Sequence, residues 1–347
     1  MSAGPGVGVG TRIAGEQNVR TDPGTLERKL AGWIASVGSR YYLRKPDVAE
    51  LLEVKFPSLR SVRDAARNEL AFRARLERSA VLSSVNLELT NHCNLRCTFC
   101  PVNTTMERPK GFMDPGLFRR IIDENPQFDF VLAFQWGEPL LHPQFFDLVR
   151  YAAERGVRTM ITSNGTHLSP ENRRRLLECG LERVTFSVDG DHITHRRIRG
   201  VDLADLRRDI LALVAERDAA GARLRIDISM VVDAATESAL DTYFADWKGI
   251  ADRVQAIPRL VAERRTTPCR ELWRGTLVVL WDGRVTTCCV DSEGLLTVGD
   301  ARTERLVDVF NGERMRAIRR AHADGRFPAL CEMCGEYEHP AVSKRFR

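Results

Sequence analysis

Three closely spaced cysteines have the residue type and spacing of an iron–sulfur site. Cys93, Cys97 and Cys100 form the pattern CxxxCxxC, and thiolates are the usual ligands of iron–sulfur clusters. Because three thiolates are supplied, one iron of a four-iron cube stays open to another ligand. A zinc site or a set of redox thiols is the alternative, but structural zinc takes four ligands and the nearest further candidate is His92. We therefore predict a [4Fe–4S] cluster on this triad.

A second set of four cysteines lies near the C-terminus. The set consists of Cys269, Cys288, Cys331 and Cys334, in the pattern C-x13-G-x4-C followed later by CxxC. A hairpin that turns at Asp282-Gly283 would bring the first two together, and four thiolates complete the coordination of a [4Fe–4S] cube. A structural zinc fits the same spacing. With the first cluster present, we expect an auxiliary iron–sulfur cluster here.

Two further residues are candidates for a catalytic role on the substrate. Cys289 directly follows Cys288 and is a packed thiol, an alternative cluster ligand, or a hydrogen-atom donor of the kind that a radical epimerase needs. Arg259 comes at the end of a predicted strand, ten residues before Cys269. At that position it could contact a substrate oxygen or form an ordinary surface ion pair.

The elements that must position these residues alternate between strands and helices. The predicted strands are 85–89, 130–134, 158–162, 183–188, 224–232 and 254–260, and the predicted helices between them include 115–124, 143–155, 170–179 and 203–220. Strands separated by helices form right-handed βαβ units in a parallel sheet, and six strands are too few for a closed eight-stranded barrel. The predicted fold class is therefore α/β, with an open, partial (β/α)6 barrel.

Different patterns flank the barrel on both sides. The predicted units are a flexible tail (1–24), a helical N-terminal extension (25–84), the partial barrel (85–265) and a small, separate C-terminal α+β unit (266–347). In the extension, apolar side chains recur at helical spacing, as in Val62, Ala65, Ala66, Leu70 and Leu76. The C-terminal unit has a hairpin pattern and then one helical segment over 306–321.

Composition limits the class of protein. The 347 residues include 52 Lys and Arg against 47 Asp and Glu, a net charge of +5, and this small, scattered excess predicts no nucleic-acid partner. No apolar run is long enough to cross a membrane, and the N-terminus lacks the pattern of a signal peptide. Nine cysteines without an export signal favour metal or redox chemistry over disulfides. We expect a cytoplasmic protein with no membrane partner.

Taken together, the triad and the segments after later strands resemble the radical S-adenosylmethionine (SAM) superfamily over about 85–335. Phe99 stands where that family usually has an aromatic residue whose neighbouring backbone contacts the adenine. The resemblance implies that the open iron binds the amino and carboxylate groups of SAM. Reductive cleavage of the sulfonium then gives a 5′-deoxyadenosyl radical that removes a hydrogen atom from substrate, so the cofactor supplies the difficult chemistry.

Segments at the ends of the later strands are similar to motifs of the same family. Residues 135–139, QWGEP, resemble its GGEP segment with Trp136 in place of the first glycine, which implies contact with the methionine ammonium of SAM. Residues 163–165 (SNG) and 187–190 (SVDG) follow the third and fourth strands, at the edge where such folds build active sites. The resemblance implies a cofactor-binding set of Phe99, Gly137, Glu138, Ser163, Asn164, Ser187, Asp189 and Arg199.

The C-terminal unit resembles the twitch domain, the shortened form of the SPASM domain. A full SPASM domain has seven cysteines and two auxiliary clusters, and no cysteine follows Cys334, so the resemblance implies one auxiliary [4Fe–4S] cluster. The four-cysteine pattern is similar to that of the radical SAM dehydrogenase acting on 2-deoxy-scyllo-inosamine, an aminocyclitol antibiotic precursor.

What this resemblance implies is oxidation of a secondary alcohol on a sugar, aminocyclitol or related metabolite. A carbinol hydrogen is abstracted and the ketyl electron passes to the auxiliary cluster, with SAM and two [4Fe–4S] clusters as cofactors and a flavodoxin or ferredoxin as reductant. Epimerisation of a sugar or aminoglycoside with Cys289 as hydrogen donor is one alternative, and modification of a ribosomal peptide is another. The non-enzymatic alternative is a zinc-stabilised binding module.

Overall fold

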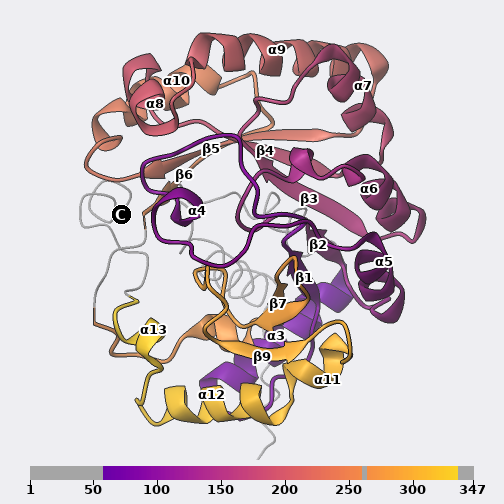
Figure 1. Cartoon of the computed structure of the whole chain (residues 1–347), viewed down its shortest axis with the longest axis vertical. Coiled ribbons are helices and arrows are strands. Elements are labelled where there is room, and N and C mark those ends of the chain that lie inside the picture. Colours follow the sequence, from indigo (N-terminus) through magenta and orange to yellow (C-terminus); the bar gives the residue numbers. More distant parts are fainter. Residues whose placement is uncertain (1–57, 260–263, 335–347) are drawn as a thin grey trace, which may run out of the picture.

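The computed structural model describes residues 58–259 and 264–334 (Figure 1). The expected tail at 1–24 and the expected extension as far as residue 57 lie outside the described residues. The same holds for the last residues of the C-terminal unit, 335–347.

Six parallel strands form the main part of one sheet. They are β1 (Ser84–Leu87), β2 (Phe130–Leu132), β3 (Arg158–Ser163), β4 (Arg183–Ser187), β5 (Arg225–Val232) and β6 (Arg253–Pro258). Each pairs in parallel with the next along the chain, and the sheet curves without closing (Figure 1). The predicted partial (β/α)6 barrel is therefore confirmed.

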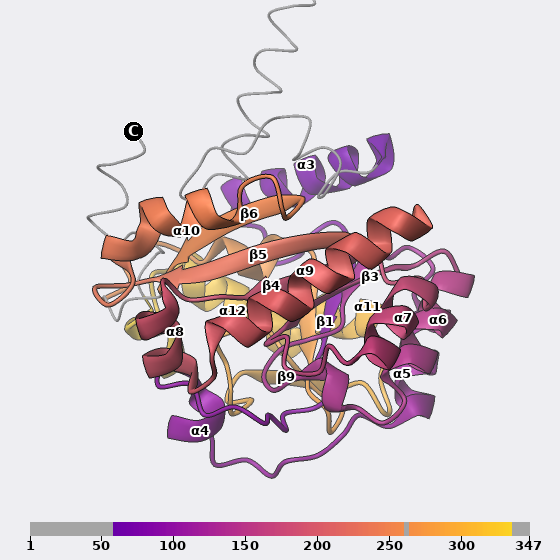
Figure 2. The same ribbon diagram turned by 90° about the horizontal axis from the view of Figure 1, so that it is seen from above.

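The connecting helices lie on the outer side of the curved sheet (Figures 1 and 2). They are α5 (Pro115–Glu124), α6 (Phe145–Glu154), α7 (Pro170–Glu178), α8 (His192–Arg199), α9 (Leu203–Ala220) and α10 (Leu240–Trp247). Short helices α4 (Pro101–Thr104), η1 (Pro139–Leu141) and η2 (Glu237–Ala239) complete the connections. The bounds of α5 and α9 agree with those predicted from helical periodicity, whereas α4, α8 and α10 were not predicted.

Alternation along the strands gives the sheet an apolar outer face and a polar inner face. Val184 and Phe186 of β4 and Ile226 of β5 have no exposed surface and belong to the core that also contains α9 side chains. The residues between them therefore point to the inner face. We call the inner side of the curved sheet the lumen. Its polar side chains include Asn86 (β1), Thr185 and Ser187 (β4), Asp227 and Ser229 (β5), and Gln255 (β6).

The C-terminal unit continues the same sheet. Its elements are η3 (Arg270–Trp273), β7 (Thr276–Val279), β8 (Arg284–Thr286), β9 (Thr297–Asp300), α11 (Leu306–Phe310), α12 (Glu313–Ala323) and α13 (Ala329–Glu332). The hairpin β7–β8 is confirmed, and β7 pairs in parallel with β1. The unit is therefore joined to the barrel by backbone hydrogen bonds, where we had expected a separate module. The single helix expected over 306–321 is wrong, because the chain breaks at Asn311-Gly312 between α11 and α12.

Helix α3 (Leu59–Arg73) forms where helical spacing predicted one, but most of its buried side chains are polar, and the predicted Val62, Ala65 and Ala66 are only half-buried. Leu70, expected inside, is 66% exposed, while Asn68 and Glu69 are buried. The reason is polar: the Asn68 side-chain carbonyl oxygen accepts from Ser79 Oγ and from the backbone N–H groups of Ala80 and Val81. Asn68 thus supplies the hydrogen-bond acceptor for the backbone N–H groups of the turn that leads into β1.

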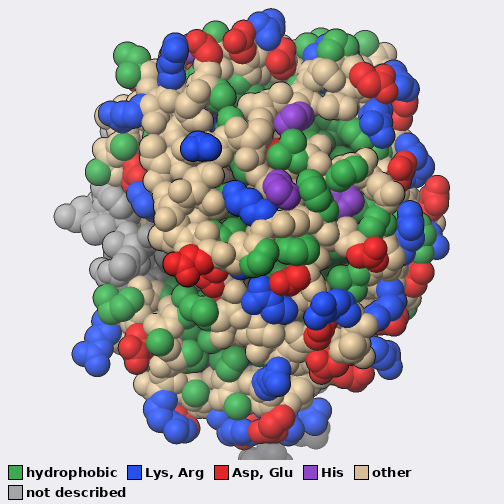
Figure 3. All heavy atoms as spheres, viewed as in Figure 1, with side chains coloured by type: hydrophobic (Ala, Val, Ile, Leu, Met, Phe, Trp, Pro, Cys, Tyr) green, Lys and Arg blue, Asp and Glu red, His purple; other side chains and the backbone are tan. Residues whose placement is uncertain are grey.

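The face of the molecule seen in Figure 3 carries charges of both signs. In the part of the chain that the structure describes, no helix is both long and apolar enough to cross a membrane.

Candidate active site

The first cysteine triad lies on the loop between β1 and α4. The loop is fixed to α8 by a hydrogen bond from Thr98 N to the carbonyl of Ile198 (3.0 Å), and to α4 by Asn103 Nδ2 donating to Leu95 O (2.8 Å). Burial, together with the neighbouring thiols of Cys97 and Cys93, raises the pKa of the Cys100 thiol to about 11. The structure therefore brings the three predicted ligands together.

Glu138 lies beside this loop and is almost completely buried. Its carboxylate accepts hydrogen bonds from Ser163 Oγ (2.9 Å), Asn164 N (2.7 Å) and Leu140 N (3.1 Å). Burial raises the pKa of Glu138 to about 7, although these donors oppose the shift. Ser163 and Asn164, predicted as direct cofactor contacts, thus hold Glu138 in place. Asn164 Nδ2 also lies 3.8 Å from Cys93 Sγ.

Gly137 is needed where the QWGEP segment meets the cysteine loop. Its φ of +90° is a conformation that side chains disfavour, and an added Cβ would lie 2.5 Å from the carbonyl oxygen of Thr90 and 2.6 Å from that of His92. Glu138 N donates to the same His92 carbonyl (2.8 Å). The glycine therefore allows the two loops to touch, which sets the position of Glu138.

Asp189 and Arg199 form a buried ion pair on the other side of the triad. Arg199 Nε donates to Asp189 Oδ2 (2.7 Å), and Asp189 Oδ1 accepts from Val231 N (2.9 Å). Arg199 Nη1 lies 4.0 Å from Cys97 Sγ. Two residues predicted as cofactor-binding are thus joined, with the cation next to a predicted ligand. Ser187, two residues before Asp189, is half-buried in the lumen.

Phe99 and Arg259 are brought together across the barrel edge. The guanidinium carbon of Arg259 lies 5.6 Å from the centre of the Phe99 ring, within the range of a cation–π contact. Arg259 also pairs with Asp233 (3.3 Å), and its side chain is half exposed. Arg259 therefore lies beside the cysteine loop and forms the surface ion pair that was one of its two alternatives, while its contact with a substrate oxygen stays a prediction.

The four C-terminal cysteines converge from three separate segments. Cys269 precedes η3, Cys288 follows β8, and Cys331 and Cys334 flank the end of α13. Burial raises the pKa of Cys269 to about 12, with Glu271 and Cys334 adding to the shift. Burial raises the pKa of Cys331 to about 11, and Cys334 again adds to it. Cys269 in turn raises the pKa of Cys288, so each of the four thiols lies near another member of the group.

Both groups have the donor chemistry of iron–sulfur sites. Each is made of cysteine sulfur, the usual ligand of such clusters. Within the described ranges, no group of three or more His, Cys, Asp or Glu side chains is arranged to hold a metal ion. By donor type, the residues of both groups fit [4Fe–4S] clusters.

Three residues that the sequence analysis missed join the two groups. Gln135 accepts from Asn86 Nδ2 (3.2 Å) and donates to the backbone carbonyl of Cys289. Glu88 and Arg108 form a fully buried ion pair. Arg108 also donates to Ser292 O, and Glu88 accepts from Trp281 N. Gln135 was visible as the first residue of the QWGEP segment, whereas nothing in the sequence pattern singles out Glu88 and Arg108.

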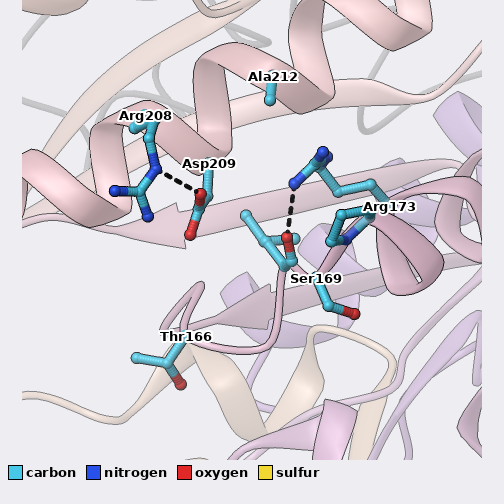
Figure 4. Close-up of a pocket in the computed structure, with 8 residues that line it drawn as sticks. Thr166, Ser169, Arg173, Arg208, Asp209 and Ala212 are labelled. Carbon is cyan, nitrogen blue, oxygen red and sulfur yellow. Dashed lines mark hydrogen bonds and ion pairs between the residues drawn. The ribbon is translucent and has the colours of Figure 1, made fainter.

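A pocket of about 500 Å³ lies outside the barrel, between the start of α7 and α9 (Figure 4). Arg173, Arg208 and Asp209 line it, and Arg208 is turned toward Asp209. It contains none of the residues predicted from sequence, and we do not assign it to the active site.

Comparison with known families identifies the two domains. Residues 87–240 match the sequence model of the radical SAM superfamily, and residues 269–335 match that of SPASM, an iron-sulfur cluster-binding domain. The chain therefore contains a radical SAM domain over 87–240 and a C-terminal SPASM domain over 269–335. These domains imply SAM with a [4Fe–4S] cluster in the first region and auxiliary iron–sulfur chemistry in the second.

Similar proteins have diverse activities. The AdoMet-dependent heme synthase of Methanosarcina barkeri is 35% identical over 116 residues, which is 33% of this chain and 33% of that protein. The mycofactocin maturase MftC of Mycobacterium tuberculosis (strain H37Rv) is 29% identical over 188 residues, 54% of this chain and 46% of that one. The chain thus matches about a third of the first relative's length and about half of the second's.

Solved structures share the fold at low identity. BtrN in complex with AdoMet and 2-DOIA has a TM-score of 0.54 at 18% identity, over 74% of this chain and 94% of that chain. SuiB of Streptococcus suis bound to the precursor peptide SuiA has a TM-score of 0.53 at 15% identity, over 81% and 76%.

Proposed function

We propose that this protein oxidises a secondary alcohol of a sugar, aminocyclitol or similar polar metabolite to a ketone. The carbinol carbon loses a hydrogen atom, the hydroxyl group loses a proton to solvent, and the remaining electron leaves through the C-terminal cluster. When bound, SAM and the reduced triad cluster supply the hydrogen-abstracting chemistry. Cys93, Cys97 and Cys100 would hold that cluster, and Cys269, Cys288, Cys331 and Cys334 would hold the second.

The observation that carries this proposal is a set of buried polar atoms in the lumen that have no hydrogen-bond partner among the described residues. Asn86 Oδ1, Asp227 Oδ1 and Gln255 Oε1 are buried and accept no hydrogen bond from any described residue. The other carboxylate oxygen of Asp227 accepts from Arg183, whose Nε is also buried without a partner among the described residues. A buried acceptor without a donor costs about 1–3 kcal/mol, so these positions favour a ligand that brings several donors. Hydroxyl and ammonium groups are such donors, and they are what a sugar or an aminocyclitol offers. A porphyrin or an apolar side chain would leave these acceptors unpaired.

The position of the C-terminal cysteines supports an electron path from the lumen. Lumen residue Asn86 bonds to Gln135, and Gln135 bonds to the backbone of Cys289, next to the predicted ligand Cys288. A substrate in the lumen would therefore lie between QWGEP, on the SAM side, and the loop of the second cluster. The complex of BtrN with AdoMet and 2-DOIA is compatible with this substrate class.

The remaining predicted residues would position SAM. Glu138, held by Ser163 and Asn164, has a carboxylate suited to accept from the amino group of SAM. Arg199, held by Asp189, would contact the Cys97 side of the triad, and Phe99 would border the adenine. Ser187 is half-buried in the lumen and would lie between these contacts and the substrate.

Product analysis tests the proposal. The reconstituted enzyme is incubated anaerobically with SAM, a substoichiometric one-electron reductant and candidate amino sugars and aminocyclitols, starting with 2-deoxy-scyllo-inosamine. We expect a ketone two mass units below the substrate, and more than one product per added electron, because each turnover returns an electron to the enzyme. A product of unchanged mass with hydrogen from solvent would instead identify an epimerase.

Peptide modification is the second candidate function. Its support is the structural likeness to SuiB, which was solved with a precursor peptide. Binding of a precursor peptide, together with a modified peptide and no ketone from any small alcohol, would favour this alternative.

A further inference from the structure

A buried arginine contacts the C-terminal cysteine group. Arg265 is 8% exposed, and its Nη2 lies 3.4 Å from Cys334 Sγ. Nη1 of the same side chain donates to the Thr267 carbonyl (3.2 Å), while the backbone N–H of Arg265 donates to the Glu332 carbonyl (2.8 Å). Both the backbone and the guanidinium of Arg265 are therefore fixed beside the CxxC end of the group.

Among the described residues, the hydrogen-bond partners of the Arg265 side chain include a ligand sulfur and no carboxylate. Its side-chain hydrogen bonds within the described residues go to a thiol and a carbonyl, and a buried cation without an anion is costly. Cys334, one of the four predicted ligands, is therefore in direct contact with this guanidinium.

We propose that Arg265 raises the reduction potential of the C-terminal cluster and so makes that cluster the electron acceptor of the reaction. Reduction adds one negative charge to a cluster of four thiolates, and a fixed positive charge stabilises the reduced form more than the oxidised form. A hydrogen bond to a ligand sulfur acts in the same direction, because charge and hydrogen bonding at sulfur set cluster potentials. Arg265 is thus a positioning residue that acts through the cluster and does not touch substrate.

This inference rests on the proposed function, because it assumes that the four cysteines hold an iron–sulfur cluster. The two can fail separately. Iron and sulfide analysis of the full-length protein tests the cluster, product analysis tests the oxidation, and the potential tests Arg265.

The test is a redox titration of the reconstituted full-length enzyme followed by electron paramagnetic resonance. The signal that changes on addition of SAM marks the triad cluster, which leaves the other signal for the C-terminal cluster. In Arg265→Gln we expect the ratio of reduced to oxidised C-terminal cluster to fall at least tenfold at a fixed potential, which is about 59 mV for one electron. Arg265→Lys keeps the charge but not the planar fork, so a smaller shift in the same direction is expected.

Arg264→Gln is the matched control, because Arg264 is the preceding residue and its side chain is exposed. It should leave both potentials unchanged, and the triad cluster should keep its potential in every variant. A native C-terminal potential in Arg265→Gln with its full iron content would overturn the proposal. If that variant assembles no C-terminal cluster, Arg265→Lys decides: a lowered potential supports the proposal and a native one overturns it.

Discussion

The side-chain amide of Gln135 donates a hydrogen bond to the backbone carbonyl of Cys289, which lies 154 positions further along the chain. This bond joins the segment next to Glu138 to the loop that follows Cys288. We expect Gln135→Leu to lower the yield of ketone per 5′-deoxyadenosine about fivefold, the effect of losing roughly 1 kcal/mol of positioning. Gln135→Glu keeps the acceptor for Asn86 but lacks the donor to Cys289, so it should show the same loss. Unchanged yields in both variants would mean that this bond does not couple the two sites.

The raised pKa of Glu138 leads us to expect that SAM binding depends on pH. This pKa is raised to about 7 by burial, so the carboxyl group is mostly protonated at pH 6 and must ionise to accept from the amino group of SAM. We expect the affinity of the reconstituted enzyme for SAM to rise about tenfold from pH 6 to pH 8. Glu138→Gln removes the titrating group and should flatten this part of the profile in calorimetric titrations. An equally steep profile in the variant would assign the pH dependence to another group.

The same shift affects the protein without SAM. The folded-state pKa of Glu138 lies above the ordinary glutamate value of 4.5, so the folded protein binds this proton more tightly than the unfolded chain. The contribution of Glu138 to the free energy of unfolding should therefore be present below pH 4.5 and decline as the pH rises to about 7.

The Asp189–Arg199 pair predicts a stability effect that depends on both partners. Arg199→Met leaves Asp189 charged and buried without its cation, which costs about 3–5 kcal/mol. Asp189→Asn combined with Arg199→Met removes both charges and should recover part of this loss. Denaturant unfolding of the two variants measures the difference. If the double variant is no more stable than Arg199→Met, the cost comes from lost packing rather than from an unpaired charge.

Cys289 distinguishes oxidation from epimerisation. Its side chain is exposed, and its proposed contribution is the backbone carbonyl that binds Gln135. We therefore expect Cys289→Ala to form ketone at a near-native rate, with no deuterium entering carbon from deuterated water. An epimerase would lose its product in this variant and would incorporate solvent deuterium in the native enzyme. Mass spectrometry of the recovered substrate and product measures both.

Much of the fold could be predicted from the sequence because its pattern is local. The parallel strands show as apolar runs, and α5 and α9 begin and end where the periodicity does. The parallel pairing of β7 with β1 could not be predicted, since it joins segments far apart in the chain. The inner face of α3 was also missed, because Asn68 is buried to satisfy a backbone turn and this follows no hydrophobic pattern.

In the candidate site, too, some features could be predicted from the sequence and others could not. The cysteines and the strand-end motifs could be found from residue type and spacing, and the structure brings both cysteine groups together. The supporting contacts could not, since Arg108 pairs with Glu88 and Arg265 contacts Cys334 across 20 and 69 positions without any motif. Such contacts depend on tertiary packing, which places an ordinary arginine beside a buried acid or thiol.

The central claim is that two separate iron–sulfur clusters, one on each cysteine group, support reductive cleavage of SAM. The most direct measurement is the iron and sulfide content of anaerobically reconstituted protein, together with 5′-deoxyadenosine formation. We predict about eight irons and eight sulfides in the native protein, the sum of two [4Fe–4S] clusters. Replacing Cys93, Cys97 and Cys100 by alanine should leave about four irons and abolish 5′-deoxyadenosine. Native protein that binds zinc but no sulfide and never cleaves SAM would contradict the account.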